Sequence, residues 1–143
     1  AAVTLADCRT GFFGTLYSAV LRLVASRCQA QLRSDDLLGR MGGEEFAIAL
    51  PGLDHAAAGL VAERLRLALR EVRPGFALPG GVLTASFGIA VRQPGEGLGQ
   101  LLLRADDALY AAKRGGRDRV QVAAIGLPPL PAASVSQVAS QHA

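Results

Sequence analysis

The sequence is poor in cysteine and contains no long apolar run. Its only cysteines, Cys8 and Cys28, form no CxxC pair and have no metal-ligand spacing, so they indicate ordinary thiols in a reducing compartment rather than a zinc site. No apolar run reaches the roughly 18 residues that a membrane span needs, and no signal peptide is evident. We therefore expect a cytoplasmic chain without a membrane segment, which leaves open a membrane sensor in a longer parent protein.

Lysine is also scarce, because only Lys113 among the 15 basic residues is a lysine. The formal charge of +3 is mild and spread along the chain, so it suits a nucleotide phosphate better than a long nucleic acid. With 143 residues, 50% of them hydrophobic and 19% charged, the chain has the size and composition of one globular domain.

The segment 42–50, GGEEFAIAL, predicts a hairpin tip that leads into a strand. From residue 46 the larger apolar side chains recur at every second position, which is typical of a half-buried strand. Gly42 and Gly43 suit a two-residue turn that needs positive φ, which would put Glu44 and Glu45 at its tip. Adjacent carboxylates repel one another, and Mg²⁺ would relieve that repulsion. The alternative is a solvated, charged turn.

Periodicity predicts the remaining elements. Apolar residues spaced three and four apart indicate helices at 16–32, 54–72 (with Asp54 as N-cap) and 98–114, and alternation indicates strands at 82–91 and 120–122. Arg64, Arg66 and Arg70 on the second helix are interpreted as a solvated face. Helices and strands that alternate around one sheet predict the α+β class.

Three blocks of sequence resemble the GGDEF family of diguanylate cyclases. They are GGEEF preceded by RSDDLLGRM, then LTASFGIAV, then RADDALYAAKRGGRDRV, and they follow in the family's order over residues 17–122. The resemblance implies a central, mostly antiparallel sheet flanked by helices, similar to the nucleotide-cyclase and polymerase-palm fold and thus ferredoxin-like. The family's N-terminal strand and helix are expected to be missing or degenerate here. We expect a degenerate segment 1–14, a GGDEF-like domain 15–122 and a disordered tail 123–143.

The resemblance also implies an activity. In the family, two domains face each other, each holding one GTP, and the 3'-hydroxyl of each GTP attacks the α-phosphorus of the other. The products are cyclic di-GMP and pyrophosphate, so GTP, Mg²⁺, cyclic di-GMP and a homodimer are expected. Glu44 matches the magnesium-binding carboxylate and Glu45 its catalytic neighbour. Gly42 and Gly43 match the turn that lies against the nucleotide.

Two further pairs match functional positions of the family. Lys113 and Arg117 match its phosphate-binding cations, and their alternative reading is a favourable charge at a helix C-terminus. Arg33 and Asp36 form an RxxD sequence that matches the inhibitory cyclic di-GMP site, and their alternative reading is a local ion pair.

The chain also departs from the family pattern. Aligned without gaps, the family's strand aspartate that shares the magnesium falls near Ala1, and its guanine-reading residues fall on Arg9 and Ser18. Asp7 could replace the aspartate only through a shifted backbone. Two hypotheses therefore stand: a diguanylate cyclase with product inhibition, or an inactive domain that serves as a cyclic di-GMP receptor or dimerisation module.

Overall fold

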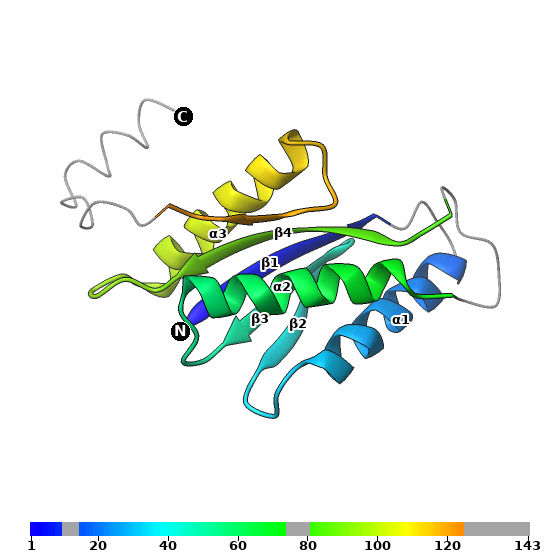
Figure 1. The fold of residues 1–143 in the computed structure, drawn as a ribbon, viewed down its shortest axis with the longest axis horizontal. Helices are drawn as coiled ribbons and strands as arrows, with labels where there is room; N and C mark the ends of the chain where they lie inside the picture. Colours follow the sequence, from blue (N-terminus) through cyan, green and yellow to red (C-terminus); the bar gives the residue numbers. More distant parts are fainter. Residues whose placement is uncertain (10–14, 74–80, 125–143) are drawn as a thin grey trace.

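The computed structural model describes residues 1–9, 15–73 and 81–124 (Figure 1). Five strands and three helices alternate in this part of the chain. They are β1 (Ala2–Arg9), α1 (Thr15–Gln31), β2 (Leu37–Gly42), β3 (Glu45–Leu50), α2 (His55–Arg70), β4 (Thr84–Val91), α3 (Leu98–Arg114) and β5 (Val120–Val122).

All five strands join one sheet in the order β2-β3-β1-β4-β5. β1 pairs antiparallel with both β3 and β4, and β2 pairs antiparallel with β3, whereas β5 runs parallel to β4. The expected α+β class with a mostly antiparallel sheet is therefore confirmed. Because β1 lies at the centre, a residue near its end has neighbours on both sides.

The expectation of a missing or degenerate first strand is wrong. β1 is a regular eight-residue strand whose residues are nearly all buried. Ala2, Ala6 and Cys8 pack on one side of the sheet, while Val3 and Leu5 pack on the other. Most of its residues are small, so large and small side chains alternate over too few positions for period-two patterning to detect the strand. Residues 10–14 of the expected degenerate segment lie outside the described residues.

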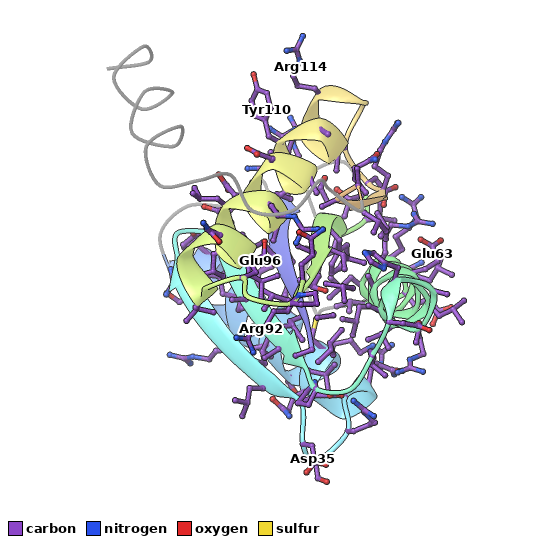
Figure 2. The ribbon with its side chains drawn as sticks, turned by 90° about the vertical axis from the view of Figure 1, so that its left-hand side faces the viewer. Asp35, Glu63, Arg92, Glu96, Tyr110 and Arg114 are labelled. Carbon is purple, nitrogen blue, oxygen red and sulfur yellow. The ribbon has the colours of Figure 1, made fainter. Side chains whose placement is uncertain are left out.

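The helices cover the two faces of the sheet unequally. α1 and α2 pack on one face and contribute the larger apolar core, whereas α3 packs alone on the other. Figure 2 shows α2 and α3 on opposite sides of the strands. The larger core includes Val20, Val24, Ile48, Leu65, Leu69, Phe87 and Ile89. Since α3 is the only helix described on its face, its C-terminal end can meet the end of β1.

A glycine in β4 sets how closely α3 approaches the sheet. A Cβ atom at Gly88 would lie 2.1 Å from the backbone nitrogen of Leu109 and 2.3 Å from the carbonyl oxygen of Ala105. Any larger residue would push the helix away. The small residues on this face of β4 are thus explained by a helix packed against them, which brings the last turn of α3 close to the strands.

Helix positions follow the sequence periodicity closely. α3 begins and ends at the predicted residues, and Asp54 caps α2 by accepting a hydrogen bond from the backbone N–H of Ala57 at 2.8 Å. None of the helices in the described ranges is long and apolar enough to cross a membrane. The predicted disordered tail, 123–143, lies outside the described residues from residue 125 onward.

Candidate active site

The hairpin between β2 and β3 turns one residue later than expected. Gly43 and Glu44 form the turn, and Gly42 pairs with Glu45 across it. Gly42 and Gly43 have φ angles of 145° and 51°, values that favour glycine, and the register shifts between Arg40 and Gly42. A side chain at either glycine would point into open space. The glycines are therefore required by the backbone conformation rather than by crowding.

A third carboxylate, that of Asp7, lies beside the two of the hairpin. Asp7 pairs with Glu45 across β1 and β3, and the N–H of Cys8 donates to the carbonyl oxygen of Glu44 at 3.0 Å. Residues directly opposite one another in a sheet point to the same face. Asp7 and Glu45 therefore share the face covered by α3, with Glu44 at the adjoining turn.

The pKa of the Cys8 thiol is affected by the negative charge of these carboxylates. Its pKa lies well above the usual value, first because the side chain is buried and then because Cys28, Asp7 and Glu44 add negative charge nearby. Burial likewise raises the pKa of Cys28 to about 11. Both cysteines are free and buried thiols. Neither is suited to act as a thiolate ligand or nucleophile at neutral pH.

Lys113 brings a positive charge from α3 to the acidic end of β1. Its Nζ lies 2.5 Å from a carboxylate oxygen of Asp7, and both side chains are mostly buried. Lys113 is in the last turn of α3, and Arg117 follows in the loop that leads to β5. The N–H of Arg117 donates to the carbonyl oxygen of Ala112 at 3.0 Å, which folds this loop back onto the helix end.

This donor set fits a hard cation such as Mg²⁺. Mg²⁺ binds through one or two carboxylates and completes its shell with water and substrate phosphates, so it needs no cage of protein ligands. The described residues contain no cluster of three or more His, Cys, Asp or Glu placed to hold a metal. Asp7 and Glu44 are the residues that could hold the ion together with substrate oxygens.

The structure separates Ala1, near which the ungapped alignment placed the family's metal-binding aspartate, from the hairpin of Glu44 and Glu45. Ala1 lies at the opposite end of β1, where its carbonyl oxygen accepts a hydrogen bond from the N–H of Arg92 at 2.9 Å. Asp7 occupies the end beside the hairpin instead. Asp7 is the only carboxylate in β1, and this was the signal that the sequence offered. The alignment gap that brings Asp7 opposite Glu45 became evident only from the pairing of the strands.

A hollow of about 570 Å³ opens between α1 and β2. Ser18, a position expected to meet guanine, lines it together with Arg22, Arg40 and Phe46. Nε of Arg40 donates to the carbonyl oxygen of Gly43 at 3.0 Å, so this hollow adjoins the hairpin turn. Arg9, the other such position, is exposed at the end of β1.

A second charged region lies in the loop between α1 and β2. A guanidinium nitrogen of Arg33 lies 3.0 Å from Asp36, and the N–H of Arg33 donates to the same carboxylate at 2.8 Å. Asp36 is almost fully buried, which raises the pKa of its carboxyl, but the hydrogen bonds and charge of Arg33, helped by Arg64, outweigh burial and lower it overall. The local ion pair expected as the alternative reading is present.

Arg64 from α2 joins this second region. Arg33, Asp36 and Arg64 line one hollow of about 300 Å³, and Arg64 also donates to the carbonyl oxygen of Gln31 at 2.9 Å. Arg64 is exposed, as the prediction of a solvated face implied, but its contact with the loop before β2 was not predicted, because nothing in the local sequence links α2 to that loop.

The described residues thus form a palm-like α+β domain. An acidic turn and a basic helix end meet at the same end of the central strand β1. A family model described as "Diguanylate cyclase, GGDEF domain" matches residues 18–119. The chain belongs to the GGDEF domain family.

Individual relatives agree with this assignment. The chain is 39% identical over 104 residues to the diguanylate cyclase DgcP of Pseudomonas aeruginosa, covering 73% of this chain and 16% of DgcP. The GGDEF domain of DgcB from Caulobacter crescentus, solved in complex with c-di-GMP, matches with a TM-score of 0.76 and 31% identity over 85% of this chain and 77% of that one.

The active GGEEF domain of a diguanylate cyclase from Vibrio cholerae matches with a TM-score of 0.75 and 26% identity, covering 87% of this chain and 83% of that one. The chain spans only 16% of DgcP and 33% of the Vibrio cholerae diguanylate cyclase VdcA. The similarity therefore concerns one domain of longer proteins.

Proposed function

We propose that this domain is a diguanylate cyclase that condenses two GTP molecules into cyclic di-GMP. The observation that carries the proposal is the pairing of Asp7 with both Lys113 and the hairpin of Glu44 and Glu45, which assembles carboxylates and a cation from distant parts of the chain. Membership in the GGDEF family supports GTP as the substrate.

Asp7 and Glu44 would hold Mg²⁺, and Glu45 would support the same site. When bound, the ion neutralises charge on the phosphates and helps to align the attacking hydroxyl with phosphorus. Glycine at positions 42 and 43 gives an open turn, which lets a phosphate approach the backbone. Lys113 lies in the last turn of α3 and Arg117 in the loop after it, so both would bind the polyphosphate at the basic end of this helix.

The reaction requires a second copy of the domain. A 3'-oxygen forms a new bond to the α-phosphorus of the other GTP while the bond from that phosphorus to pyrophosphate breaks, and the hydroxyl proton is released. One domain provides one such nucleotide site, so two domains must face each other for both bonds to form. We therefore propose that the active species is a homodimer.

We further propose that cyclic di-GMP binds in the hollow lined by Arg33, Asp36 and Arg64 and that this binding inhibits the enzyme. Asp36 accepts hydrogen bonds from the backbone N–H and from the guanidinium of Arg33. These bonds orient the guanidinium at the surface, where 53% of the Arg33 side chain is exposed. Arginine offers planar donors that suit guanine and phosphate. The DgcB domain, solved with c-di-GMP, is a structural relative that supports this ligand.

Incubation of the purified chain with GTP and magnesium tests the activity. We expect cyclic di-GMP and pyrophosphate to accumulate, and we expect the Glu44→Ala variant to produce neither above background. Failure of the wild-type chain to exceed the Glu44→Ala variant would remove the cyclase assignment.

The second candidate function is a cyclic di-GMP receptor without turnover. The observation that favours it is the serine at position 18 in the hollow beside the hairpin, since one hydroxyl offers less to a guanine edge than a carboxylate does. A chain that binds cyclic di-GMP through Arg33 but makes none would establish this function instead.

A further inference from the structure

The loop between α3 and β5 has an unusual backbone beside Arg117. Arg117 and Asp118 have φ angles of 63° and 47°, and they are the only residues other than glycine with positive φ in the described ranges. Side chains make this left-handed conformation unfavourable, more so for arginine than for aspartate, so it persists only where surrounding contacts enforce it. The cause of this conformation must therefore lie in the contacts of the loop.

Asp118 has partners on two other elements. Arg66 Nη1 lies 3.0 Å from one of its carboxylate oxygens, and Arg70 donates to the other oxygen. The N–H of Asp118 donates to the hydroxyl of Ser86 on β4 at 3.1 Å. Both sides of one residue are thus tied, the carboxylate to α2 and the backbone to the sheet.

The partners of Asp118 are themselves held in place. Ser86 is buried and pairs directly with Asp7 across β4 and β1. Arg66 also binds a second carboxylate, because its Nε donates a hydrogen bond to Glu63 at 2.9 Å. The hydrogen bonds that Arg66 donates to Glu63 and then to Asp118 raise the pKa of Arg66 further above its usual value. Figure 2 places Glu63 on the outer side of α2, so Asp118 is the carboxylate that links this arginine to the loop within the described part of the chain.

Arg119 adds contacts within the same loop. Arg119 lies over the two glycines that follow α3, since a Cβ atom on Gly116 would come within 2.7 Å of its guanidinium. Nε of Arg119 donates to the carbonyl oxygen of Arg117 at 3.1 Å. The backbone of Arg117 is therefore hydrogen-bonded to α3 through its N–H and to Arg119 through its carbonyl oxygen, and Asp118 links the loop to α2.

We propose that Asp118 is a positioning residue, which fixes the backbone of Arg117 so that its guanidinium and Lys113 bind the same polyphosphate. The inference rests on the proposed function, because it concerns how the GTP phosphates are bound. Asp118 does not touch substrate in this proposal and acts through Arg117. Arg66 and Arg70, interpreted from the sequence as a solvated face, then serve the site by holding Asp118.

The kinetic consequence is specific to binding. A long arginine side chain loses conformational freedom when it binds phosphate, and a fixed backbone reduces that loss. Without Asp118 the loop can relax, and the resulting loss of phosphate-binding free energy is the same in the ground state and in the transition state. Uniform loss of binding raises KM and leaves kcat nearly unchanged.

The test compares Asp118→Ala with Asp107→Ala, an exposed carboxylate on α3 that serves as the matched control. We expect Asp118→Ala to raise KM for GTP about tenfold or more with little change in kcat. We expect Asp107→Ala to leave both constants as in the wild type. Asp118→Asn, which keeps oxygen and backbone contacts, is expected to restore part of the affinity. A KM unchanged in Asp118→Ala would overturn the proposal.

A double-mutant cycle with Arg117→Ala separates positioning from a general effect on stability. If Asp118 acts through Arg117, Asp118→Ala adds no further increase in KM once Arg117 is alanine, whereas independent effects add. Additive increases would overturn the proposal. Calorimetric titration of magnesium pyrophosphate, a probe that needs no turnover, should show the same pattern of affinities.

These readouts distinguish the two levels of inference. If the wild-type chain produces cyclic di-GMP but Asp118→Ala binds pyrophosphate as the wild type does, the positioning role fails and the cyclase assignment stands. If the wild-type chain neither turns over GTP nor binds pyrophosphate, the proposed function fails and the positioning role fails with it.

Discussion

The two charged regions of this domain differ in how far along the chain their partners lie. Arg33 and Asp36 are three residues apart and form their ion pair within a single loop. Asp7 and Lys113 come from the first strand and the last helix and meet only in the folded protein. The Arg33–Asp36 ion pair can be predicted from sequence because its two residues are close in the chain, whereas the Asp7–Lys113 pair forms only because β1 lies at the centre of the sheet.

The two regions also treat their carboxylates differently. Asp36 is buried and already receives hydrogen bonds from the side chain and backbone of Arg33, so it has little capacity for a further ligand. Asp7 has one cation as its partner and lies beside two more carboxylates. Asp36 is therefore suited to orient an arginine, and Asp7 is suited to bind a metal ion with substrate.

The largest effect is expected from Asp7→Asn. Removal of a metal-binding carboxylate should reduce the rate of cyclic di-GMP formation by about a hundredfold or more, since even groups that only orient metal ligands cost up to this much. Initial rates measured with GTP and magnesium check this expectation.

Asp35→Asn is the matched control from the other region. Figure 2 shows Asp35 at the loop between α1 and β2, pointing away from the sheet, and its side chain is exposed. We expect its rate to equal that of the wild type. Equal rates in Asp7→Asn and the wild type would contradict the assignment of Asp7 to the metal site.

A smaller effect is expected from Arg33→Ala on product inhibition. Loss of charge-assisted hydrogen bonds to the dinucleotide should weaken cyclic di-GMP binding by about tenfold or more. Titration calorimetry measures the affinity, and inhibition of turnover measures the consequence. Arg64→Ala should act in the same direction, because Arg64 lines the same hollow.

Arg114→Ala provides the arginine control for this experiment. Arg114 lies at the end of α3 over the ring of Tyr110, away from the hollow (Figure 2). Its variant should bind cyclic di-GMP as the wild type does. If Arg33→Ala and Arg114→Ala had the same affinity as the wild type, the inhibitory site would not involve the RxxD loop.

The smallest effect is expected on stability, from Asp36→Asn. Loss of the charged partner should lower the free energy of unfolding by about 1 kcal/mol at neutral pH, as measured by urea denaturation. The pKa of Asp36 is lowered in the folded state, so its charge stabilises the fold above the unfolded pKa of about 4, and this contribution disappears as pH falls through the folded pKa. The two proteins should therefore converge below that range, and a difference that persisted in acid would contradict an electrostatic origin.

Sequence patterns predicted the elements in which large apolar side chains recur at a regular period, including β4, which is buried on both faces. α3 has a clear apolar stripe and was predicted at its observed bounds, and Asp54 was predicted as the cap of α2. The hairpin was predicted one residue early, because the register shift at Gly42 depends on strand pairing. β1 was missed because Val3 and Leu5 are its only large apolar residues, too few to establish a period.

The sequence by itself determined the α+β class, the acidic turn at Glu44 and Glu45, and the local pair of Arg33 and Asp36. Each of these depends on residues close together in the chain, where periodicity, turn chemistry and short spacing act directly. Only the tertiary structure decided that Asp7 joins the acidic turn and that Arg66 and Arg70 hold Asp118. Those pairings follow from the order of strands and from the faces on which α2 and α3 pack, and no local pattern encodes either.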